Sequence, residues 1–296
     1  MTEPAKYREH RYRSADGRLD LFARDYPEKG EKNHSPPLLM MHGLTRNSAD
    51  FEPLIELLGI DNQRIIVPDQ RGRGQSDYDG DPANYRPDVY AADMWALLDD
   101  LGIERVICIG TSMGGLIAMV MGATSPERVA GIALNDVGPE VSQAGLDRIR
   151  SYVSGGVPIT NWDEAAIRCA DINGSALLGF NDSDWLAFAK RTCCELPDGT
   201  IRFAYDPAIS RSMEDQEPAT VPPDLWGLWG ALAETPILTI RGERSDILES
   251  CTVAEMQRRH PEDFSSIEVR DRGHAPILDE PEAVRAIGRF LTELTN

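Results

Sequence analysis

The chain has 296 residues and a formal net charge of −19, which makes nucleic acids and anionic membrane surfaces poor partners for it. The N-terminus lacks the apolar stretch of a secretory signal, and no apolar run reaches the roughly 18 residues of a membrane span. The five cysteines are odd in number and lack metal-type spacing, which favours reduced thiols. We therefore expect a cytoplasmic protein with no metal or cofactor and with no nucleic-acid or membrane partner. The oligomeric state is left open.

Short apolar strands alternate with amphipathic helices in both outer parts of the chain. A hairpin is predicted first, with its turn at Asp16-Gly17. The expected strands are 6–14, 19–27, 37–42, 64–68, 105–110, 129–135, 236–241 and 265–270. The expected helices are 48–59, 87–101, one that starts after residue 112, 252–259 and 280–294. This alternation predicts an α/β fold whose mostly parallel, eight-stranded sheet has helices on both faces.

The middle of the chain, residues 138–234, has a different pattern, which is helical and polar without a convincing strand. We expect it to form a helical cap over the active site, inserted into a core made of 1–137 and 235–296. Aromatic side chains in a cap can line an apolar pocket, or they can pack the cap helices together and onto the core. The candidate pocket residues are Trp162, Trp185, Trp226 and Trp229.

A glycine-flanked serine lies between one strand and the next helix. Residues 110–115 read Gly-Thr-Ser-Met-Gly-Gly, and they follow the apolar run 105–109. This is the Gly-x-Ser-x-Gly pattern of a nucleophile elbow. In such a sharp turn Ser112 takes a strained backbone conformation, and side chains at 110 and 114 would collide with the neighbouring strand and helix. The pattern predicts an exposed Ser112 hydroxyl at the carboxyl edge of the sheet.

A serine nucleophile needs a base, and His274 is the candidate because it stands in a Gly-His-Ala-Pro turn after the last strand. Three other histidines, His10, His34 and His260, are expected on the solvated surface. The fifth, His42, is expected to brace a turn.

The acid that orients the base is sought between the serine and the histidine in the chain. Asp246, in the turn after strand 236–241, is our choice. Two alternatives stay open: Glu243 in the same turn, and Asp136 at the end of strand 129–135.

An oxyanion hole needs two N–H donors near the nucleophile. Strand 37–42 is followed by Gly43, Leu44 and Thr45, so the backbone N–H of Leu44 is one candidate donor. The N–H of Met113, directly after the serine, is the other.

Taken in order, these motifs resemble the α/β-hydrolase superfamily over nearly the whole chain. The resemblance rests on the His42-Gly43 turn, the segment 69–76, the Ser112 elbow, the Asp246 loop and the Gly273-His274 turn. It implies that the segment 69–76 shapes a loop and does not bind phosphate. The fold hosts many reactions, so the family alone does not identify the substrate.

The expected reaction is acyl transfer to water, with a small, partly apolar ester or lactone as the substrate. The same nucleophile is compatible with carbon–carbon bond hydrolysis or cofactor-free perhydrolysis. The resemblance implies a glycine-rich stretch after the His-Gly turn in carbon–carbon hydrolases, which residues 44–47 lack. A non-catalytic ligand-binding protein is the alternative from a different class.

Overall fold

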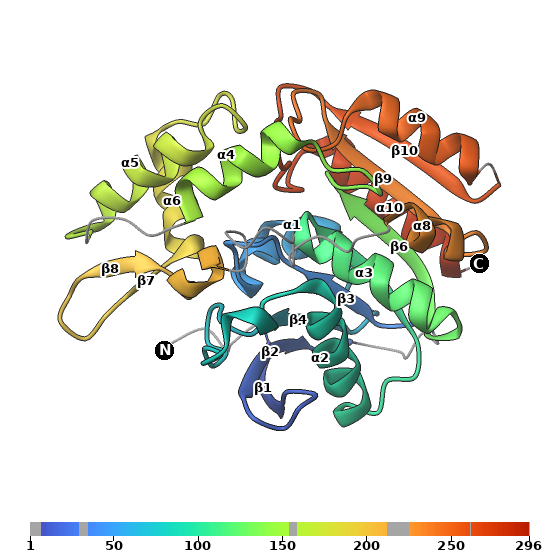
Figure 1. The fold of residues 1–296 in the computed structure, drawn as a ribbon, viewed down its shortest axis with the longest axis horizontal. Helices are drawn as coiled ribbons and strands as arrows, with labels where there is room; N and C mark the ends of the chain where they lie inside the picture. The colour runs from blue at the N-terminus through green and yellow to red at the C-terminus, as the bar shows by residue number, and fades with distance from the viewer. Residues whose placement is uncertain (1–6, 30–34, 154–158, 212–224, 261, 296) are drawn as a thin grey trace.

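Eight strands form one sheet at the centre of the molecule (Figure 1) in the computed structural model, which describes residues 7–29, 35–153, 159–211, 225–260 and 262–295. The strands are β1 (Arg8–Arg13), β2 (Asp20–Tyr26), β3 (Leu38–Met41), β4 (Ile65–Asp69), β5 (Val106–Thr111), β6 (Val129–Asn135), β9 (Ile237–Gly242) and β10 (Phe264–Val269). Their order across the sheet is β1-β2-β4-β3-β5-β6-β9-β10. Strand β2 is antiparallel to its two neighbours, and the pairs from β4 to β10 are parallel. The predicted α/β fold is confirmed.

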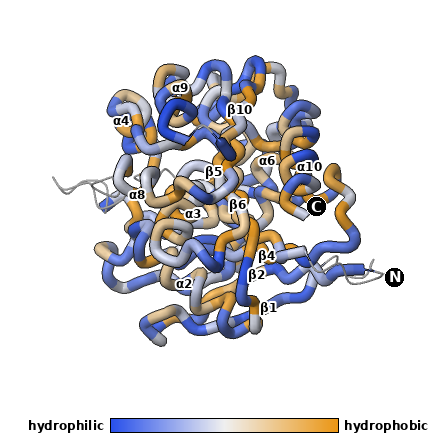
Figure 2. Tube along the Cα trace, turned by 90° about the vertical axis from the view of Figure 1, so that its right-hand side faces the viewer, coloured by the Kyte–Doolittle hydropathy of each residue, from blue (hydrophilic) through white to orange (hydrophobic). Residues whose placement is uncertain are grey.

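Helices cover both faces of this sheet. One apolar core includes side chains of α2 (Pro87–Asp100), α3 (Met113–Thr124), α8 (Leu225–Ala231) and α9 (Ser250–Arg259). A second core, on the other face, includes side chains of α1 (Glu52–Leu58) and α10 (Pro281–Thr295). Figure 2 shows hydrophobic segments along the strands and hydrophilic turns at the periphery. The short 3-10 helices are Ser48–Phe51, Pro82–Asn84, Pro126–Arg128 and Pro207–Ser210.

The segment between β6 and α8 crosses the carboxyl ends of the central strands (Figure 1). It contains α4 (Gln143–Val153), α5 (Trp162–Asn173) and α6 (Asp182–Thr192), followed by a hairpin of β7 (Cys193–Glu195) and β8 (Ile201–Phe203). The hairpin differs from the expectation of a strandless region. Its connection contains Pro197-Asp198-Gly199, a turn signal, and Gly199 has a positive φ of 83°.

Helix α8 belongs with the core helices, although the predicted cap boundary at 234 includes it. It packs against α3, and Trp229 on α8 is only 1% exposed, in ring contact with His260 and Phe264. His260 is itself 2% exposed, with Nε2 within hydrogen-bond distance of the Leu232 and Thr235 carbonyls. The expectation of a solvated His260 is therefore wrong, because the helix before it ends against α8.

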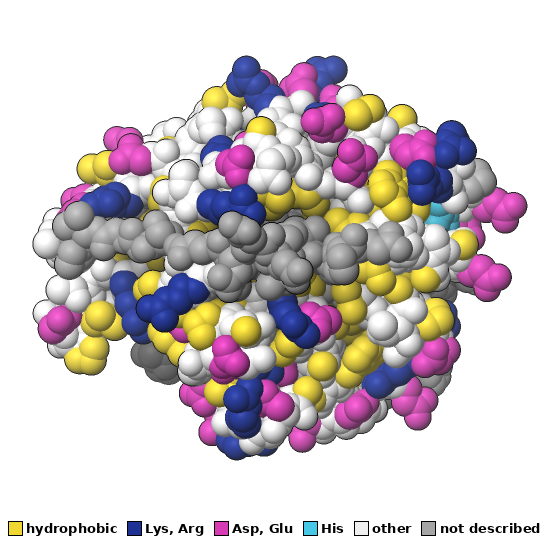
Figure 3. Space-filling model, viewed as in Figure 1, with side chains coloured by type: hydrophobic (Ala, Val, Ile, Leu, Met, Phe, Trp, Pro, Cys, Tyr) yellow, Lys and Arg dark blue, Asp and Glu magenta, His cyan; other side chains and the backbone are white. Residues whose placement is uncertain are grey.

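Charge is spread over the surface without a single-signed field on the face seen in Figure 3, where acidic and basic side chains are interspersed. Among the residues that the structure describes, no helix is long and apolar enough to cross a membrane. The same residues hold no group of three or more His, Cys, Asp and Glu side chains arranged for a metal ion.

Candidate active site

Ser112 occupies the sharp turn between β5 and α3, with a positive φ of 52°. Two glycines make this turn sterically possible. A Cβ on Gly110 would lie 2.3 Å from the Gly114 carbonyl oxygen, and a Cβ on Gly114 would lie 2.0 Å from the Met41 carbonyl oxygen. Real Cβ atoms do not approach that closely, so both positions require glycine. The predicted strain at Ser112 and the predicted collisions at 110 and 114 are confirmed.

A chain of two hydrogen bonds links three side chains from distant parts of the sequence. Ser112 Oγ lies 2.8 Å from His274 Nε2, and His274 Nδ1 lies 2.8 Å from Asp136 Oδ2. The His274 side chain is 7% exposed and that of Asp136 is fully buried. Such a chain can pass the hydroxyl proton to the imidazole while the carboxylate fixes its tautomer.

Asp136 is held in place from several directions. It follows the last residue of β6 and has a left-handed φ of 58°, which aspartate tolerates better than most residues. Its Oδ1 accepts a hydrogen bond from the Gly242 N–H at 2.8 Å, and its Oδ2 accepts one from Ser245 Oγ at 2.7 Å. A buried carboxylate with these donors stays oriented toward His274.

Asp246, our choice for the orienting acid, is bonded to Arg148, whereas Asp136 is bonded to His274. The geometry therefore corrects the choice of Asp246. Both of its carboxylate oxygens accept hydrogen bonds from Arg148 on α4, at 2.5 and 2.8 Å. Burial opposes ionisation of Asp246, but the bonds to Arg148 outweigh it and lower the pKa of the carboxyl group. Glu243, the other alternative, is exposed and accepts from the Asp271 N–H.

Leu44 and Met113, the two residues expected to supply the oxyanion donors, line a pocket together with Ser112. Met113 is the first residue of α3, where N–H groups have no partner within the helix. The turn that carries Leu44 passes beside Ser112: a Cβ on Gly43 would lie 3.8 Å from Ser112 Cβ. Arg73 Nε donates to the Leu44 carbonyl at 3.0 Å, and this anchors the turn. That Leu44 and Met113 form the hole stays a prediction.

His42 braces the same turn, as expected. Its Nδ1 donates to the Gly43 carbonyl at 2.7 Å, and its Nε2 accepts from the Gln70 N–H at 3.1 Å. Burial lowers the pKa of His42 to about 3, so the imidazole is neutral at physiological pH and can make both bonds. The arginines of segment 69–76 are also engaged within the protein, since Arg71 is bonded to Asp93 and Asp79. This agrees with a loop-shaping role.

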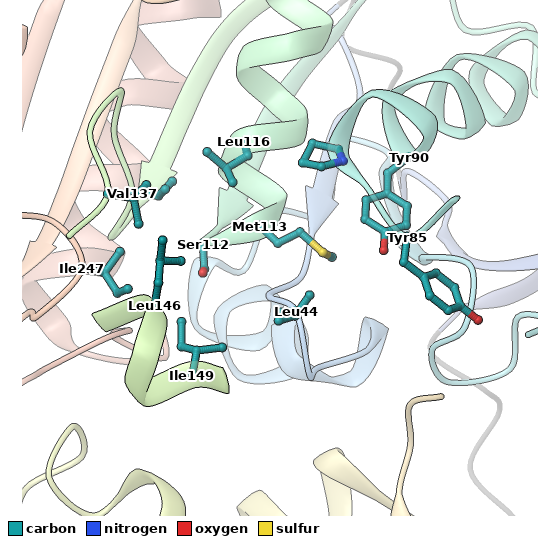
Figure 4. Close-up of a pocket in the computed structure, with 12 residues that line it drawn as sticks. Leu44, Tyr85, Tyr90, Ser112, Met113, Leu116, Val137, Leu146, Ile149 and Ile247 are labelled. Atoms are coloured by element: carbon teal, nitrogen blue, oxygen red, sulfur yellow. The ribbon is translucent and has the colours of Figure 1, made fainter. Parts of the chain in front are cut away.

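An apolar pocket of about 520 Å³, part of it open to solvent, reaches Ser112 (Figure 4). Cap helix α4 brings Leu146 and Ile149 toward the serine from one side, and Met113 lies on the other. The pocket is lined by Leu44, Tyr85, Pro87, Tyr90, Ser112, Met113, Leu116, Val137, Val141, Leu146, Ile149 and Ile247. Such a surface suits an acyl chain or a small apolar group.

A second, polar pocket of about 500 Å³, also partly open to solvent, reaches the same serine. It shares Leu44, Ser112 and Ile149 with the apolar pocket, but it also includes His274 and Arg46. The rest of its lining is Gly43, Thr45, Asp50, Thr111, Tyr152, Asn173, Ala275, Pro276 and Ile277. Ser112 therefore lies where an apolar and a polar compartment meet.

The four tryptophans proposed for the pocket lie elsewhere. Among the described residues, no tryptophan lines either pocket at Ser112. Trp185 packs against Phe180 and Phe188 inside the cap, and Trp162 Nε1 donates to Glu195. On α8, Trp229 is in the core, and Trp226 lies under Arg259, whose guanidinium carbon is 4.0 Å from the ring centroid. Packing of helices, the alternative account, explains all four.

Several pocket residues that sequence reasoning missed come from α4 and from the α2 region. Leu146 and Ile149 are three residues apart, so they share one face of α4, and this apolar spacing was a usable signal. Arg46 was harder to recognise in the sequence, because an arginine two residues after a predicted oxyanion donor does not match a sequence motif.

Comparison with known proteins finds one matching family model and relatives that match nearly the whole chain. The model of a family described as alpha/beta hydrolase fold matches residues 36–198. A 3-hydroxybutyrate-oligomer hydrolase of Cupriavidus necator is 32% identical over 273 residues, which cover 90% of this chain and 92% of that protein. A 2-(acetamidomethylene)succinate hydrolase of Mesorhizobium japonicum is 27% identical, over 93% of this chain and 92% of that protein.

The solved structures include a crystal structure of an alpha/beta hydrolase from Novosphingobium aromaticivorans. It is 43% identical to this chain, with a TM-score of 0.90, and the match covers 98% of this chain and 99% of that one. Sequence and structure are thus matched over nearly their full lengths.

Proposed function

The chain belongs to the α/β-hydrolase fold family. We propose that it is a serine hydrolase, which cleaves open or cyclic carboxylic esters of small and partly apolar compounds. The observation that carries the proposal is the hydrogen-bonded chain from Ser112 through His274 to Asp136, placed where the two pockets meet. Nucleophile, base and orienting acid are then Ser112, His274 and Asp136.

The first half of the reaction forms an acyl-enzyme. Ser112 Oγ attacks the ester carbonyl carbon while its proton passes to His274 Nε2. The negative charge that develops on the carbonyl oxygen is stabilised by the N–H groups of Leu44 and Met113. When the carbon–oxygen bond to the alcohol breaks, the leaving alkoxide takes the proton from His274. Asp136 stabilises the imidazolium throughout and keeps its own charge.

The second half regenerates the enzyme. A water molecule gives a proton to His274 Nε2 as its oxygen attacks the acyl carbon. The same two N–H groups hold the second oxyanion. The bond to Ser112 Oγ then breaks, Oγ recovers the proton from His274, and a carboxylic acid leaves. The sum is one ester and one water converted to an acid and an alcohol.

The comparisons support an ester as the first choice. An oligomer of a hydroxy acid is joined by ester bonds, and the 3-hydroxybutyrate-oligomer hydrolase matches this chain almost end to end. A second candidate is hydrolysis of a non-ester bond at the same serine. It is favoured by the nearly full-length similarity to a 2-(acetamidomethylene)succinate hydrolase.

The test is a substrate panel combined with active-site labelling. We expect hydrolysis of p-nitrophenyl esters from acetate to decanoate, and stoichiometric labelling of the peptide that contains Ser112 by an alkyl fluorophosphonate, detected by mass spectrometry. Protein unfolded in urea is the control, because Ser112 then loses its base. Folded protein that neither takes the label nor hydrolyses esters and lactones would contradict the proposal and favour a binding protein. Turnover of 2-(acetamidomethylene)succinate alone would favour the second candidate.

The chain-length optimum should depend on cap helix α4. Leu146→Trp fills part of the apolar pocket, so we expect kcat/KM for p-nitrophenyl octanoate to fall about 10-fold or more, while that for the acetate changes less than about threefold. Leu57→Trp is the matched control, because Leu57 is 53% exposed on α1. Equal losses for acetate and octanoate would show that the residue does not size the acyl pocket.

A further inference from the structure

The two pockets at Ser112 receive different halves of an ester. The leaving alkoxide must take its proton from His274, so the alcohol half has to lie on the side of the site that His274 borders. His274 lines the polar pocket and not the apolar one. The acyl half is thereby assigned to the apolar pocket, and the alcohol half to the polar one. This assignment rests on the proposed ester hydrolysis.

Arg46 is the cation among the described residues that line the polar pocket. It follows Leu44 by two residues, and its Cγ and Ser112 Cβ both lie 3.8 Å from the position of a Gly43 Cβ. The guanidinium crosses from the core to the cap, where it donates to Thr192 Oγ1 at 3.3 Å and to Asn173 Oδ1 at 3.2 Å. Its carbon Cζ lies 4.1 Å from the ring centroid of Phe188.

The charge of Arg46 is only partly compensated inside the protein. Both acceptors, Thr192 and Asn173, are neutral. Among the residues that the structure describes, the carboxylate oxygen nearest to the guanidinium is on Asp50, 3.9 Å away, which is an ion-pair distance without a hydrogen bond. The Arg46 side chain is 15% exposed, so it is largely removed from water. A guanidinium carries five N–H donors in a planar fork that matches a carboxylate. Donors thus remain for a ligand.

A neutral donor lies in the same pocket. Burial raises the pKa of Tyr152, and its hydroxyl therefore stays protonated around neutral pH. Tyr152 lines the polar pocket together with Arg46. Arg46 and Tyr152 thus line one compartment with a cation and a neutral hydroxyl, and the Asp50 carboxylate lines it too. A cation and a hydroxyl in one compartment can form a receptor for an anionic group.

We propose that the polar pocket binds a carboxylate on the alcohol half of the substrate, and that Arg46 determines this specificity. The substrate class is then an acyl ester of a small hydroxy acid. The acyl chain lies in the apolar pocket, and the free carboxylate lies against Arg46 and Tyr152. A neutral alkyl ester is a poorer substrate, because it leaves the guanidinium without an anionic partner.

The overall charge of the protein does not prevent such binding. The net charge of −19 repels anions at long range, but the field of exposed charges is screened over about 8 Å at physiological salt. A contact with a largely buried guanidinium is screened much less. The local cation therefore decides affinity, and the net charge acts mainly on the association rate.

The experiment compares acids with their methyl esters. The substrates are the butanoyl esters of 2-hydroxyacetate, 3-hydroxypropanoate and 4-hydroxybutanoate, each with a free carboxylate or as its methyl ester, and butanoate release is measured. For at least one spacing we expect the wild type to favour the acid about 10- to 100-fold in kcat/KM, the value of a charge-assisted bond. In Arg46→Gln we expect the ratio of kcat/KM for the acid to kcat/KM for its methyl ester to fall to near one. The fall comes from a lower kcat/KM for the acid, while kcat/KM for the methyl ester changes less than threefold.

Three further variants sharpen the result. Arg46→Lys keeps the charge without the planar fork and is expected to retain part of the preference. Asp50→Asn removes the nearby carboxylate and is expected to raise the preference. Arg150→Gln is the matched control: this α4 cation is bonded to Asp147, and its loss leaves the ratio unchanged.

The outcomes separate this inference from the proposed function. If Arg46→Gln lowers the rates on acid and methyl ester equally, or if the wild type shows no preference at any spacing, Arg46 is not a specificity residue, although ester hydrolysis stands. If the wild type cleaves no ester, calorimetric binding of the same pairs to Ser112→Ala and to Ser112→Ala/Arg46→Gln still decides. Equal affinity of both variants for the acids would overturn the carboxylate site.

Discussion

Replacement of Ser112 by alanine is expected to lower kcat for p-nitrophenyl butanoate by roughly a million-fold, the scale seen when a nucleophile or its base is removed from a serine hydrolase. Without Oγ no acyl-enzyme forms, and only the N–H groups of the turn and the binding energy remain for catalysis. The measurement is steady-state turnover, with a stopped-flow trace for the burst of p-nitrophenol that reports acyl-enzyme formation.

The fold of this variant should be unaffected. Alanine keeps Cβ in the same turn, so the melting temperature is expected to stay close to that of the wild type. Ser151→Ala is the matched control, because that α4 hydroxyl bonds only to the Arg148 carbonyl among the contacts described, and full activity is expected. Turnover within tenfold of the wild type in Ser112→Ala would remove the serine from the mechanism.

Asp136→Asn is expected to reduce kcat by about 10³- to 10⁴-fold. The asparagine amide can point an N–H group at His274 Nδ1, which then has to accept. In that tautomer Nε2 carries the proton and cannot take another from Ser112. The side chain remains isosteric: with the amide N–H₂ in the place of Oδ2, the carbonyl oxygen in the place of Oδ1 still accepts from the Gly242 N–H, and Ser245 Oγ can accept from the amide. Activity measured across pH, together with imidazole proton NMR of His274, checks this prediction.

Asp246→Asn serves as the paired variant, and it should keep kcat within about threefold of the wild type. It weakens the bond to Arg148, whose side chain is partly exposed, so the loss of folding stability should be at most about 1 kcal/mol. The reverse pattern, with Asp246→Asn inactive and Asp136→Asn active, would restore Asp246 as the orienting acid.

The positions of Ser112 and His274 could be predicted because local rules determine them. The glycines at 110 and 114 are dictated by contacts within one turn and with the adjacent strand, so their spacing is visible in the sequence. The strands were predicted for a similar reason. Fully buried strands such as β3, β5 and β6 are short apolar runs between turns, and such runs have few other interpretations.

The choice of acid could not be made from the sequence because two aspartates satisfy the same local pattern. Both follow a parallel strand, and the carboxyl ends of β6 and β9 lie side by side in the sheet. What separates them is the partner of each side chain. Asp136 is met by Ser245 and His274, whereas Arg148, from a cap helix, engages Asp246. A usable signal was that an otherwise apolar strand ends at Asn135 and is followed directly by Asp136.

The tryptophans show the same limit in the cap. Their abundance in 138–234 was real, but aromatic content does not say which face of a helix meets the site and which meets a neighbouring helix. Trp185 lies within the cap, and Trp229 belongs to the core because α8 packs on α3. Contacts between segments far apart in the chain decide where a tryptophan packs. The sequence periodicity of a single segment does not show these contacts.

With Asp136 as the proposed acid, directly after β6, the segment made of the end of β9 and the loop that follows is divided between two tasks. Up to Ser245 it supports the proton path, through the N–H of Gly242 and the hydroxyl of Ser245. From Asp246 onward it serves the substrate side: Asp246 is tied to the cap through Arg148, and Ile247 lines the apolar pocket. Under the proposed mechanism, substitutions in this second half are therefore expected to change substrate preference and to leave the reaction chemistry intact. The change from supporting the proton path to shaping the substrate pocket thus falls between two consecutive residues, Ser245 and Asp246.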